Sequence, residues 1–225
     1  MVPFSFAGEE MRLLPSRALY WPREQALLVA DLHLEKASFF AGHGQMLPPY
    51  DSRATLDRLA LAIRETGARR VFALGDNFHD DGGEARLDPH AAGMLSALTR
   101  ATDWTWITGN HDAAMAGRIG GGLARELAVG GLTLRHKAHA GELAPELSGH
   151  FHPKLTLNAR GRRIARACAV MSERRMILPA FGALTGGMNA ADPAILKAMQ
   201  PARAIDAVLP AAGRVVQYPL WRAAA

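Results

Sequence analysis

Short polar blocks that follow short apolar runs constrain the fold of this chain more than any other feature. The apolar runs, each expected to be a strand, span residues 26–30, 71–74, 104–107 and 132–134. The polar blocks are Asp31-Leu32-His33, Gly75-Asp76-Asn77, Gly109-Asn110-His111-Asp112, His136 and Gly149-His150-Phe151-His152. These blocks lie tens of residues apart, so only a folded domain could bring their side chains together.

Helical patterns separate several of the predicted strands. After the first strand, Asp51 or Ser52 is expected to cap a helix with Leu56, Leu59 and Ile63 on one face, and Gly67 is expected to end it. A second helix is predicted to begin at Asp88-Pro89. Strands that alternate with helices indicate an α/β domain, in which ligands gather beyond the carboxyl ends of the strands.

The pattern changes after His152. Residues 162–171 and 174–180 are predicted to form two strands that extend the sheet system as β-hairpins. Residues 193–199 are expected to be a short helix, and residues 214–218 a final strand. The sequence shows no internal repeat or linker, and we expect one domain over residues 1–225.

Charge and cysteine content narrow the classes of function. Residues 151–225 hold 11 Lys or Arg against 3 Asp or Glu, whereas residues 1–150 hold 15 against 18. Much of that excess comes from arginines 160, 162, 163, 166, 174 and 175, which fit either a polyanion-binding surface or a solvated basic face. The single Cys168 excludes an internal disulfide and suits the reducing cytoplasm. We expect neither a signal peptide nor a membrane span.

The polar blocks contain the side chains that two adjacent divalent ions require. In an extended Asp31-x-His33 segment, the spacing of two directs both side chains to one side, toward a single ion. Asp76 is the best candidate for a carboxylate that bridges two ions, and Asn110, His136, His150 and His152 supply further donors. Each block alone has an ordinary alternative as a turn, a helix cap or a surface loop. Chance explains their combined order poorly.

In this order, the blocks resemble those of the binuclear metallophosphoesterases, which read D-x-H, G-D, G-N-H-[DE], H and G-H-x-H. The resemblance implies a four-layer α/β/β/α sandwich with two packed mixed β-sheets flanked by helices. Residues 178–187 also resemble the bacterial branch called ligase-associated DNA damage response phosphoesterase, or PdeM-like. That likeness implies a functional association with a DNA ligase and a helicase.

Carried over by residue, the resemblance implies that Asp31, His33 and His152 hold one metal, that Asn110, His136 and His150 hold the other, and that Asp76 bridges them. The family places its fourth histidine before glycine, whereas His136 precedes Lys137, so His139 is a second candidate. Mn²⁺ is the expected metal, with Fe²⁺ and Zn²⁺ as alternatives.

His111 is next to a predicted ligand without being one, so we expect it to act as a general acid. His79 or Asp80 is expected to orient it, with Asp112 as a weaker candidate. Lys137, His139 and Phe181 are the candidate substrate contacts.

The expected function is a metal-dependent phosphodiesterase, a nuclease or endonuclease in DNA repair, in which a hydroxide that bridges the metals attacks phosphorus. One alternative is a phosphatase or nucleotide hydrolase with a small substrate, because fold and site do not fix specificity. Another is a non-catalytic metal-binding scaffold, against which the retained His111 argues. The sequence leaves the oligomeric state open.

Overall fold

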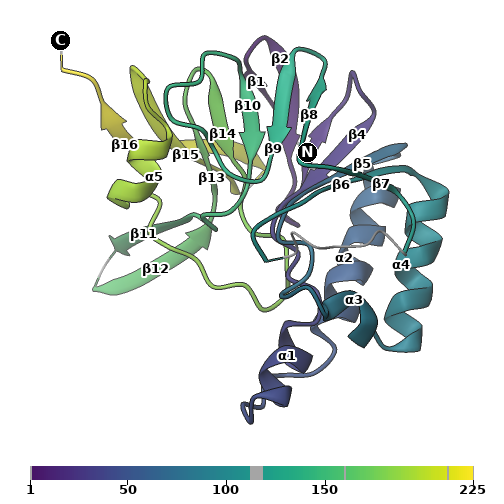
Figure 1. The fold of residues 1–225 in the computed structure, drawn as a ribbon. Coiled ribbons are helices and arrows are strands. Elements are labelled where there is room, and N and C mark those ends of the chain that lie inside the picture. Colours follow the sequence, from purple (N-terminus) through teal and green to yellow (C-terminus); the bar gives the residue numbers. More distant parts are fainter. Residues whose placement is uncertain (1, 112–118, 160, 212, 225) are drawn as a thin grey trace.

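The computed structural model describes residues 2–111, 119–159, 161–211 and 213–224, and contains two seven-stranded sheets that pack face to face (Figure 1). The first sheet has the order β1-β2-β3-β4-β5-β6-β7. Its strands are β1 (Pro3–Phe6), β2 (Glu9–Leu13), β3 (Leu19–Trp21), β4 (Ala26–Val29), β5 (Arg70–Leu74), β6 (Asp103–Ile107) and β7 (Gly122–Ala124). Neighbours are antiparallel from β1 to β4 and parallel from β4 to β7, so the sheet is mixed.

The second sheet has the order β16-β15-β13-β14-β10-β9-β8 and is also mixed. Its strands are β8 (Glu126–Val129), β9 (Leu132–Arg135), β10 (Glu146–Ser148), β13 (Ala169–Met171), β14 (Arg175–Ile177), β15 (Ala204–Ala211) and β16 (Arg214–Arg222). A separate antiparallel hairpin, formed by β11 (Lys154–Ala159) and β12 (Arg162–Ala167), projects from one side of the molecule (Figure 1).

The helices complete the outer layers. They are α1 (Lys36–Gly42), α2 (Asp51–Thr66), α3 (Gly83–Arg86), α4 (Pro89–Ala101) and α5 (Pro193–Ala198). Helices α2 and α4 cover the outer face of the first sheet, whereas α1 projects from the body (Figure 1). Among the described residues, no helix combines the length and apolarity that a membrane crossing needs.

Alternation along the strands divides the apolar side chains between the layers. Leu28 and Phe72 lie in the core between the sheets, whereas Leu27 and Val71 face α2 and α4. Trp106 is buried on that outer side. A third cluster packs α5 and β11 against the second sheet. The predicted four-layer α/β/β/α sandwich is therefore confirmed.

The predicted helices over residues 51–67 and from Asp88 onward are present, but the start of α2 differs from the expectation. Its N-cap is Tyr50, at φ 69°, with no capping side chain. Asp51 and Ser52 do not cap α2 because they bond the start of α1 and the residue before it: Asp51 Oδ2 accepts from Ala37 N, and Ser52 Oγ accepts from Glu35 N. In contrast, α4 begins at Asp88-Pro89 as predicted, and the Asp88 side chain caps it by accepting from the amides of His90 and Ala91.

The strand predicted over residues 162–171 is two strands in different sheets. Strand β12 pairs with β11, whereas β13 pairs with β14 and β15. Between them, Cys168 is fully buried and its amide donates to Pro153 O. The chain therefore leaves the hairpin at this point and enters the second sheet.

Candidate metal centre

The first two polar blocks follow the adjacent parallel strands β4 and β5, whose carboxyl ends lie at the same edge. Asp31 N donates to Gly75 O (3.2 Å), and His33 N donates to Asp76 O (2.9 Å), so the two loops are bonded to each other. The expectation of an extended Asp31-x-His33 segment is wrong: φ is 53° at Asp31 and 44° at His33. The left-handed conformation turns both side chains into the space beside Asp76.

The last block enters the same space from the second sheet, after β10. His150 and His152 are also left-handed, with φ of 73° and 49°. The amide of His150 donates to both carboxylate oxygens of Asp31, at 2.9 and 3.0 Å. This contact joins the two sheets at the site.

Glycines in these blocks are required by close approach rather than by turn geometry alone. A Cβ atom on Gly109 would lie 2.2 Å from Asp76 N, and one on Gly75 would lie 2.3 Å from His136 Nδ1. A Cβ atom on Gly149 would lie 2.8 Å from Asp31 Oδ2. Only glycine allows the polar side chains to come this close.

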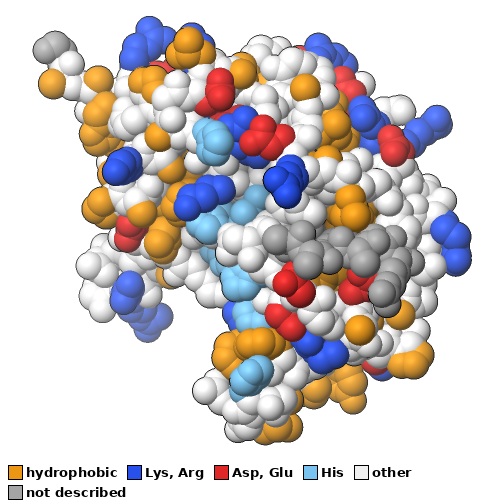
Figure 2. All heavy atoms as spheres, viewed as in Figure 1, with side chains coloured by type: hydrophobic (Ala, Val, Ile, Leu, Met, Phe, Trp, Pro, Cys, Tyr) orange, Lys and Arg blue, Asp and Glu red, His pale blue; other side chains and the backbone are white. Residues whose placement is uncertain are grey.

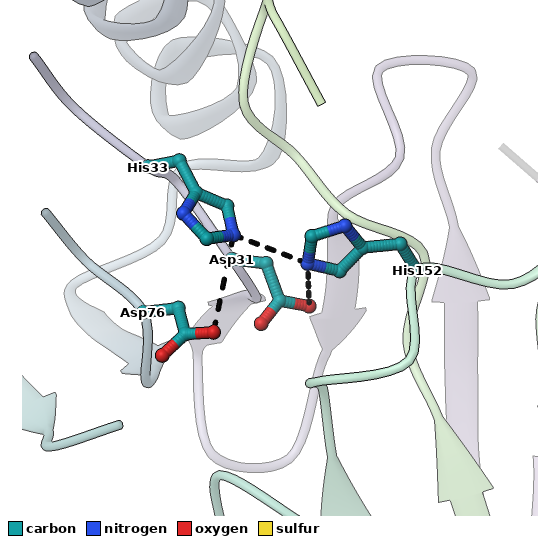
Figure 3. A group of neighbouring side chains, drawn as sticks. All are labelled: Asp31, His33, Asp76 and His152. Carbon is teal, nitrogen blue, oxygen red and sulfur yellow. Dashed lines mark hydrogen bonds and ion pairs between the residues drawn. The ribbon is translucent and has the colours of Figure 1, made fainter. Parts of the chain in front are cut away.

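The side chains form two groups that share Asp76 and whose donor atoms lie within 4.8 Å of one another. The first group is Asp31, His33, Asp76 and His152 (Figure 3). His33 Nε2 lies 3.2 Å from His152 Nε2 and 3.9 Å from Asp76 Oδ2, and His152 Nε2 lies 3.6 Å from Asp31 Oδ2.

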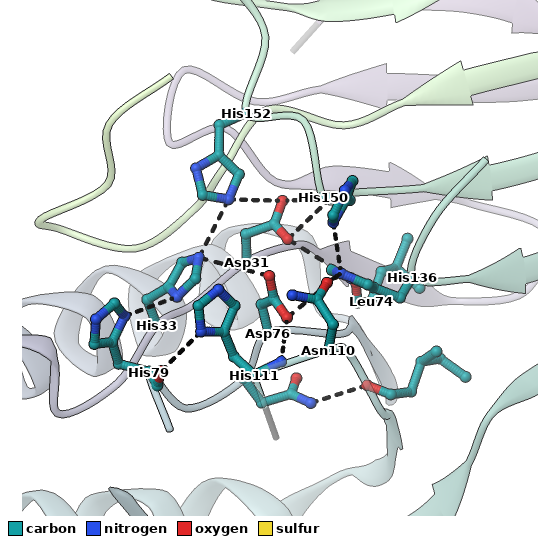
Figure 4. Close-up of polar contacts among 12 residues, drawn as sticks. Asp31, His33, Leu74, Asp76, His79, Asn110, His111, His136, His150 and His152 are labelled. Carbon is teal, nitrogen blue, oxygen red and sulfur yellow. Dashed lines mark hydrogen bonds and ion pairs between the residues drawn. The ribbon is translucent and has the colours of Figure 1, made fainter. Parts of the chain in front are cut away.

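The second group is Asp76, His136 and His150, and Asn110 adjoins it (Figure 4). His136 Nε2 lies 3.1 Å from His150 Nδ1, 2.9 Å from Asn110 Oδ1 and 3.4 Å from Asp76 Oδ1. His136, rather than His139, is thus the fourth-block histidine that the fold brings into the cluster.

The protonation pattern around His136 fits a cation. Its Nδ1 lies 3.1 Å from Leu74 O, a group that can only accept, so Nδ1 carries the hydrogen of the neutral ring. The lone pair on Nε2 then faces oxygen acceptors of Asn110 and Asp76. A divalent cation among these donors would satisfy all three, so the residues present fit a metal site.

Burial favours the neutral form of two of the ligand histidines, His33 and His150. It lowers the pKa of His33 to about 2, with the neighbouring imidazoles adding to the effect. Burial and then His136 lower the pKa of His150 to about 4. Burial raises the pKa of Asp31, although the nearby His152 and His136 oppose that shift. Metal binding would offset the cost of this buried carboxylate.

His111 lies at the edge of the cluster, and its amide donates to Asp76 Oδ1 (3.1 Å). Its ring stacks on His79, with centroids 5.4 Å apart and an interplanar angle of 17°. The main-chain oxygen of His79 lies 3.0 Å from His111 Nδ1, so His79 orients the ring through its backbone. Asp80 is instead ion-paired with Arg86, which argues against the predicted orienting role. Asp112 lies outside the described residues.

The predicted substrate contacts have different environments. Lys137 is exposed beside the centre, with its Nζ 5.9 Å from the ring centroid of Phe151. His139 is exposed, and its amide donates to Glu146. Phe181 is fully buried in the core under α2, where Arg58 lies over its ring. Phe181 therefore cannot touch a substrate at the surface, and that expectation is wrong.

Two supporting groups were missed at the level of sequence. Arg175, treated as part of a basic surface, is fully buried, with its Nε 3.3 Å from Glu146 Oε1. Glu146 also lies 3.0 Å from Arg135, the residue before His136, so the pair supports the strand end that carries this ligand candidate. Arg86 links Asp80 to Ser38 of α1. No local motif marks these residues.

The chain is similar in structure to Pseudomonas putida nuclease MPE, with 32% identity over 97% of this chain and 99% of that chain, and a TM-score of 0.72. YfcE, a phosphoesterase from E. coli, is a weaker match, with 12% identity over 87% of this chain and 98% of that chain, and a TM-score of 0.42. No protein-family profile and no curated protein sequence matches. The geometry of the paired ligand groups and the first of these similarities agree: the chain belongs to the metallophosphoesterase family that includes this nuclease.

Proposed function

We propose that this chain is a phosphodiesterase that cleaves nucleic acid with two divalent metal ions, with Mn²⁺ as the first choice. Family membership establishes the coarser statement that it is a metal-dependent phosphoester hydrolase. The observation that carries the proposal is Asp76, whose carboxylate belongs to both ligand groups. In the proposed assignment, Asp76 bridges one ion held by Asp31, His33 and His152 and another held by Asn110, His136 and His150.

When bound, such a pair of ions supplies a hydroxide nucleophile near neutral pH and neutralises charge on the phosphate. The protein supplies the proton for the leaving group. With Nδ1 of His111 engaged by His79 O, the protonated Nε2 is free to donate to the departing alkoxide. The backbone amide of His111 also donates to Asp76 Oδ1, which places the acid next to the metal pair.

Nucleic acid is the proposed substrate because the similar Pseudomonas protein is a nuclease and because an arginine-bearing hairpin begins near the centre. Strand β11 starts two residues after His152, and Arg162, Arg163 and Arg166 of β12 are exposed. Arg174 and Arg175 were predicted to belong to the same basic surface, but they have different environments. Arg174 is exposed and donates to Leu143 O, whereas Arg175 is buried and does not contribute to the surface. Arg160 lies outside the described residues.

We extend the proposal to the cellular role expected from the resemblance. The protein would act as an endonuclease in DNA repair, in functional association with a DNA ligase and a helicase. Its place would be the cytoplasm, a reducing compartment that suits the buried free thiol of Cys168.

The test is hydrolysis by protein reconstituted with Mn²⁺, Fe²⁺ or Zn²⁺ against an aryl monoester, an aryl diester, and single-stranded and duplex nucleic acids. We expect cleavage of the diester and of nucleic acid, with affinity for the polymer falling steeply as salt rises. Charge-neutral substitution of Arg162, Arg163 and Arg166 should flatten that salt dependence and leave hydrolysis of the aryl diester unchanged. Hydrolysis confined to the monoester would overturn the proposal in favour of a phosphatase.

A further inference from the structure

A group of aromatic rings borders the metal centre on the side of α1. Phe39 and Phe40 of this helix lie against His79, and His43 just beyond the helix lies against Phe39; we call these four residues the aromatic ledge. The ring centroid of Phe39 lies 4.9 Å from that of His79, 5.5 Å from that of Phe40 and 4.4 Å from that of His43. His43 is exposed, and both phenylalanines are partly exposed. Apolar rings left in contact with water beside a polar centre need an explanation.

The aromatic ledge is continuous with the metal centre. His79 stacks on His111, and its Nδ1 lies 3.4 Å from Nδ1 of His33. Figure 2 shows histidine side chains in a band down one face of the molecule. The band runs toward the projecting segment that contains α1, where hydrophobic side chains gather. A substrate whose phosphate occupies the centre can therefore place a neighbouring group beside these rings.

Buried and charged residues hold the ledge in place. Arg86 Nε donates to Ser38 Oγ (3.1 Å) while its guanidinium pairs with Asp80, which ties α1 to the loop that carries His79. At the start of α1, Ala37 N donates to Asp51 Oδ2 (3.1 Å). Asp51 and the Asp80–Arg86 pair thus position α1, and the rings are ordered before any substrate arrives.

We propose that the aromatic ledge stacks against an unpaired base next to the phosphodiester being cleaved, so that the substrate strand is single-stranded at this point. The inference rests on the proposed function. Bases in a duplex are already stacked on each other, whereas an unpaired base presents a free face that any aromatic ring accepts. Lys36, whose Nζ lies 6.0 Å from the Phe40 ring centroid, adds a cation for the adjoining phosphate.

The test compares two probes of equal length and phosphate charge: a short fluorescent oligothymidylate, and the same strand without its bases. Their affinities for Mn²⁺-loaded protein are read by stopped-flow anisotropy, before cleavage. Wild-type protein should prefer the strand with bases by about 5- to 150-fold for one stacked base. Phe39→Ala should reduce that ratio toward one and leave binding of the abasic strand unchanged.

Conservative variants separate stacking from packing. Phe39→Leu keeps an apolar side chain but has no ring, so it should lose the preference as Phe39→Ala does, whereas Phe39→Trp should keep it. Tyr218→Ala, which removes a ring 40% exposed on distant β16, is the matched control and should behave as wild type. A Phe39→Ala, Phe40→Ala double variant that keeps the full preference would overturn the ledge.

The outcomes also separate this inference from the proposed function. Wild-type protein that prefers bases but hydrolyses no phosphoester would contradict the enzymatic proposal and support the ledge. Protein that cleaves nucleic acid yet binds both probes equally would support the nuclease and overturn the ledge.

Discussion

His111 Nδ1 lies 3.0 Å from the main-chain carbonyl oxygen of His79. Because a carbonyl can only accept, Nδ1 of His111 must donate, which fixes the tautomer of the neutral ring and leaves Nε2 as the atom that exchanges a proton. A backbone carbonyl does not titrate, so this orientation holds at every pH at which the fold persists.

His111→Ala should retain two metals per chain and lose turnover by about 10²- to 10⁴-fold on an ester with a poor leaving group, because no acid would protonate the departing alkoxide. An ester with a good leaving group, which needs little protonation, should suffer far less. Metal analysis and kcat for the two esters check this expectation. His90→Ala, which removes an exposed histidine of α4, is the control; equal losses on both esters would count against an acid role.

Asp76→Ala should lose metal as well as activity, because one buried carboxylate serves both ligand groups. We expect fewer than two metals per chain and a fall in kcat/KM of about 100-fold or more. Asp57→Asn, at an exposed position of α2, should leave both quantities unchanged. Full occupancy of two metals in Asp76→Ala would contradict the bridge.

Gly109→Ala should damage the centre without removing any ligand. The new Cβ would lie 2.2 Å from Asp76 N and 2.3 Å from Asp76 Oδ1, so the Asp76 loop must shift. We expect metal affinity to fall by about 10- to 100-fold and the free energy of unfolding to fall by about 1–3 kcal/mol. Gly93→Ala is the matched control, since nothing lies within 4 Å of its Cβ and alanine favours the helix by up to about 1 kcal/mol. Isothermal titration and urea unfolding would measure both effects.

Cys168 should not react with thiol reagents in the native protein at pH 8, because burial raises the pKa of its thiol to about 12 and excludes the reagent. Labelling should proceed only as the chain unfolds, so its rate across urea concentrations should follow the unfolding transition. The sign for stability follows from the same shift: above pH 9 the unfolded thiol loses its proton and the folded one keeps it, so this group lowers stability as pH rises. Rapid labelling of native protein would show that the thiol is accessible.

The polar blocks were sufficient to predict the cluster because each follows a strand, and the carboxyl ends of neighbouring parallel strands meet at one edge. Asp31 and Asp76 therefore came together as expected. Their backbone conformation was not predictable from spacing, because the loops adopt left-handed φ values that bonds between the two loops stabilise. The alternation of side chains with a period of two applies within strands, and it does not predict side-chain directions in the loops just beyond their ends.

Long-range partners account for the other differences. Arginine is usually found at the surface, and the sequence alone gives no reason to bury Arg175. Its buried charge is compensated by Glu146, which lies on a neighbouring strand. Asp51 and Ser52 are good capping residues in sequence, but the backbone amides of Glu35 and Ala37, at the start of α1, offer them other donors. Phe181 follows the apolar residues 176–180, and such a segment can line a cleft as well as lie in a core. None of these choices is decided within a local window of sequence.

Five ligand candidates have φ between 44° and 73°, namely Asp31, His33, Asp76, His150 and His152. In this left-handed region, residues other than glycine have a steric cost of about 1 kcal/mol. Glycine at any of these positions would relax the backbone, and at Asp31 it would also remove a carboxylate whose burial is unfavourable. A laboratory selection for thermal stability alone would therefore favour replacement of these ligand candidates. Only a simultaneous selection for catalytic activity would retain them.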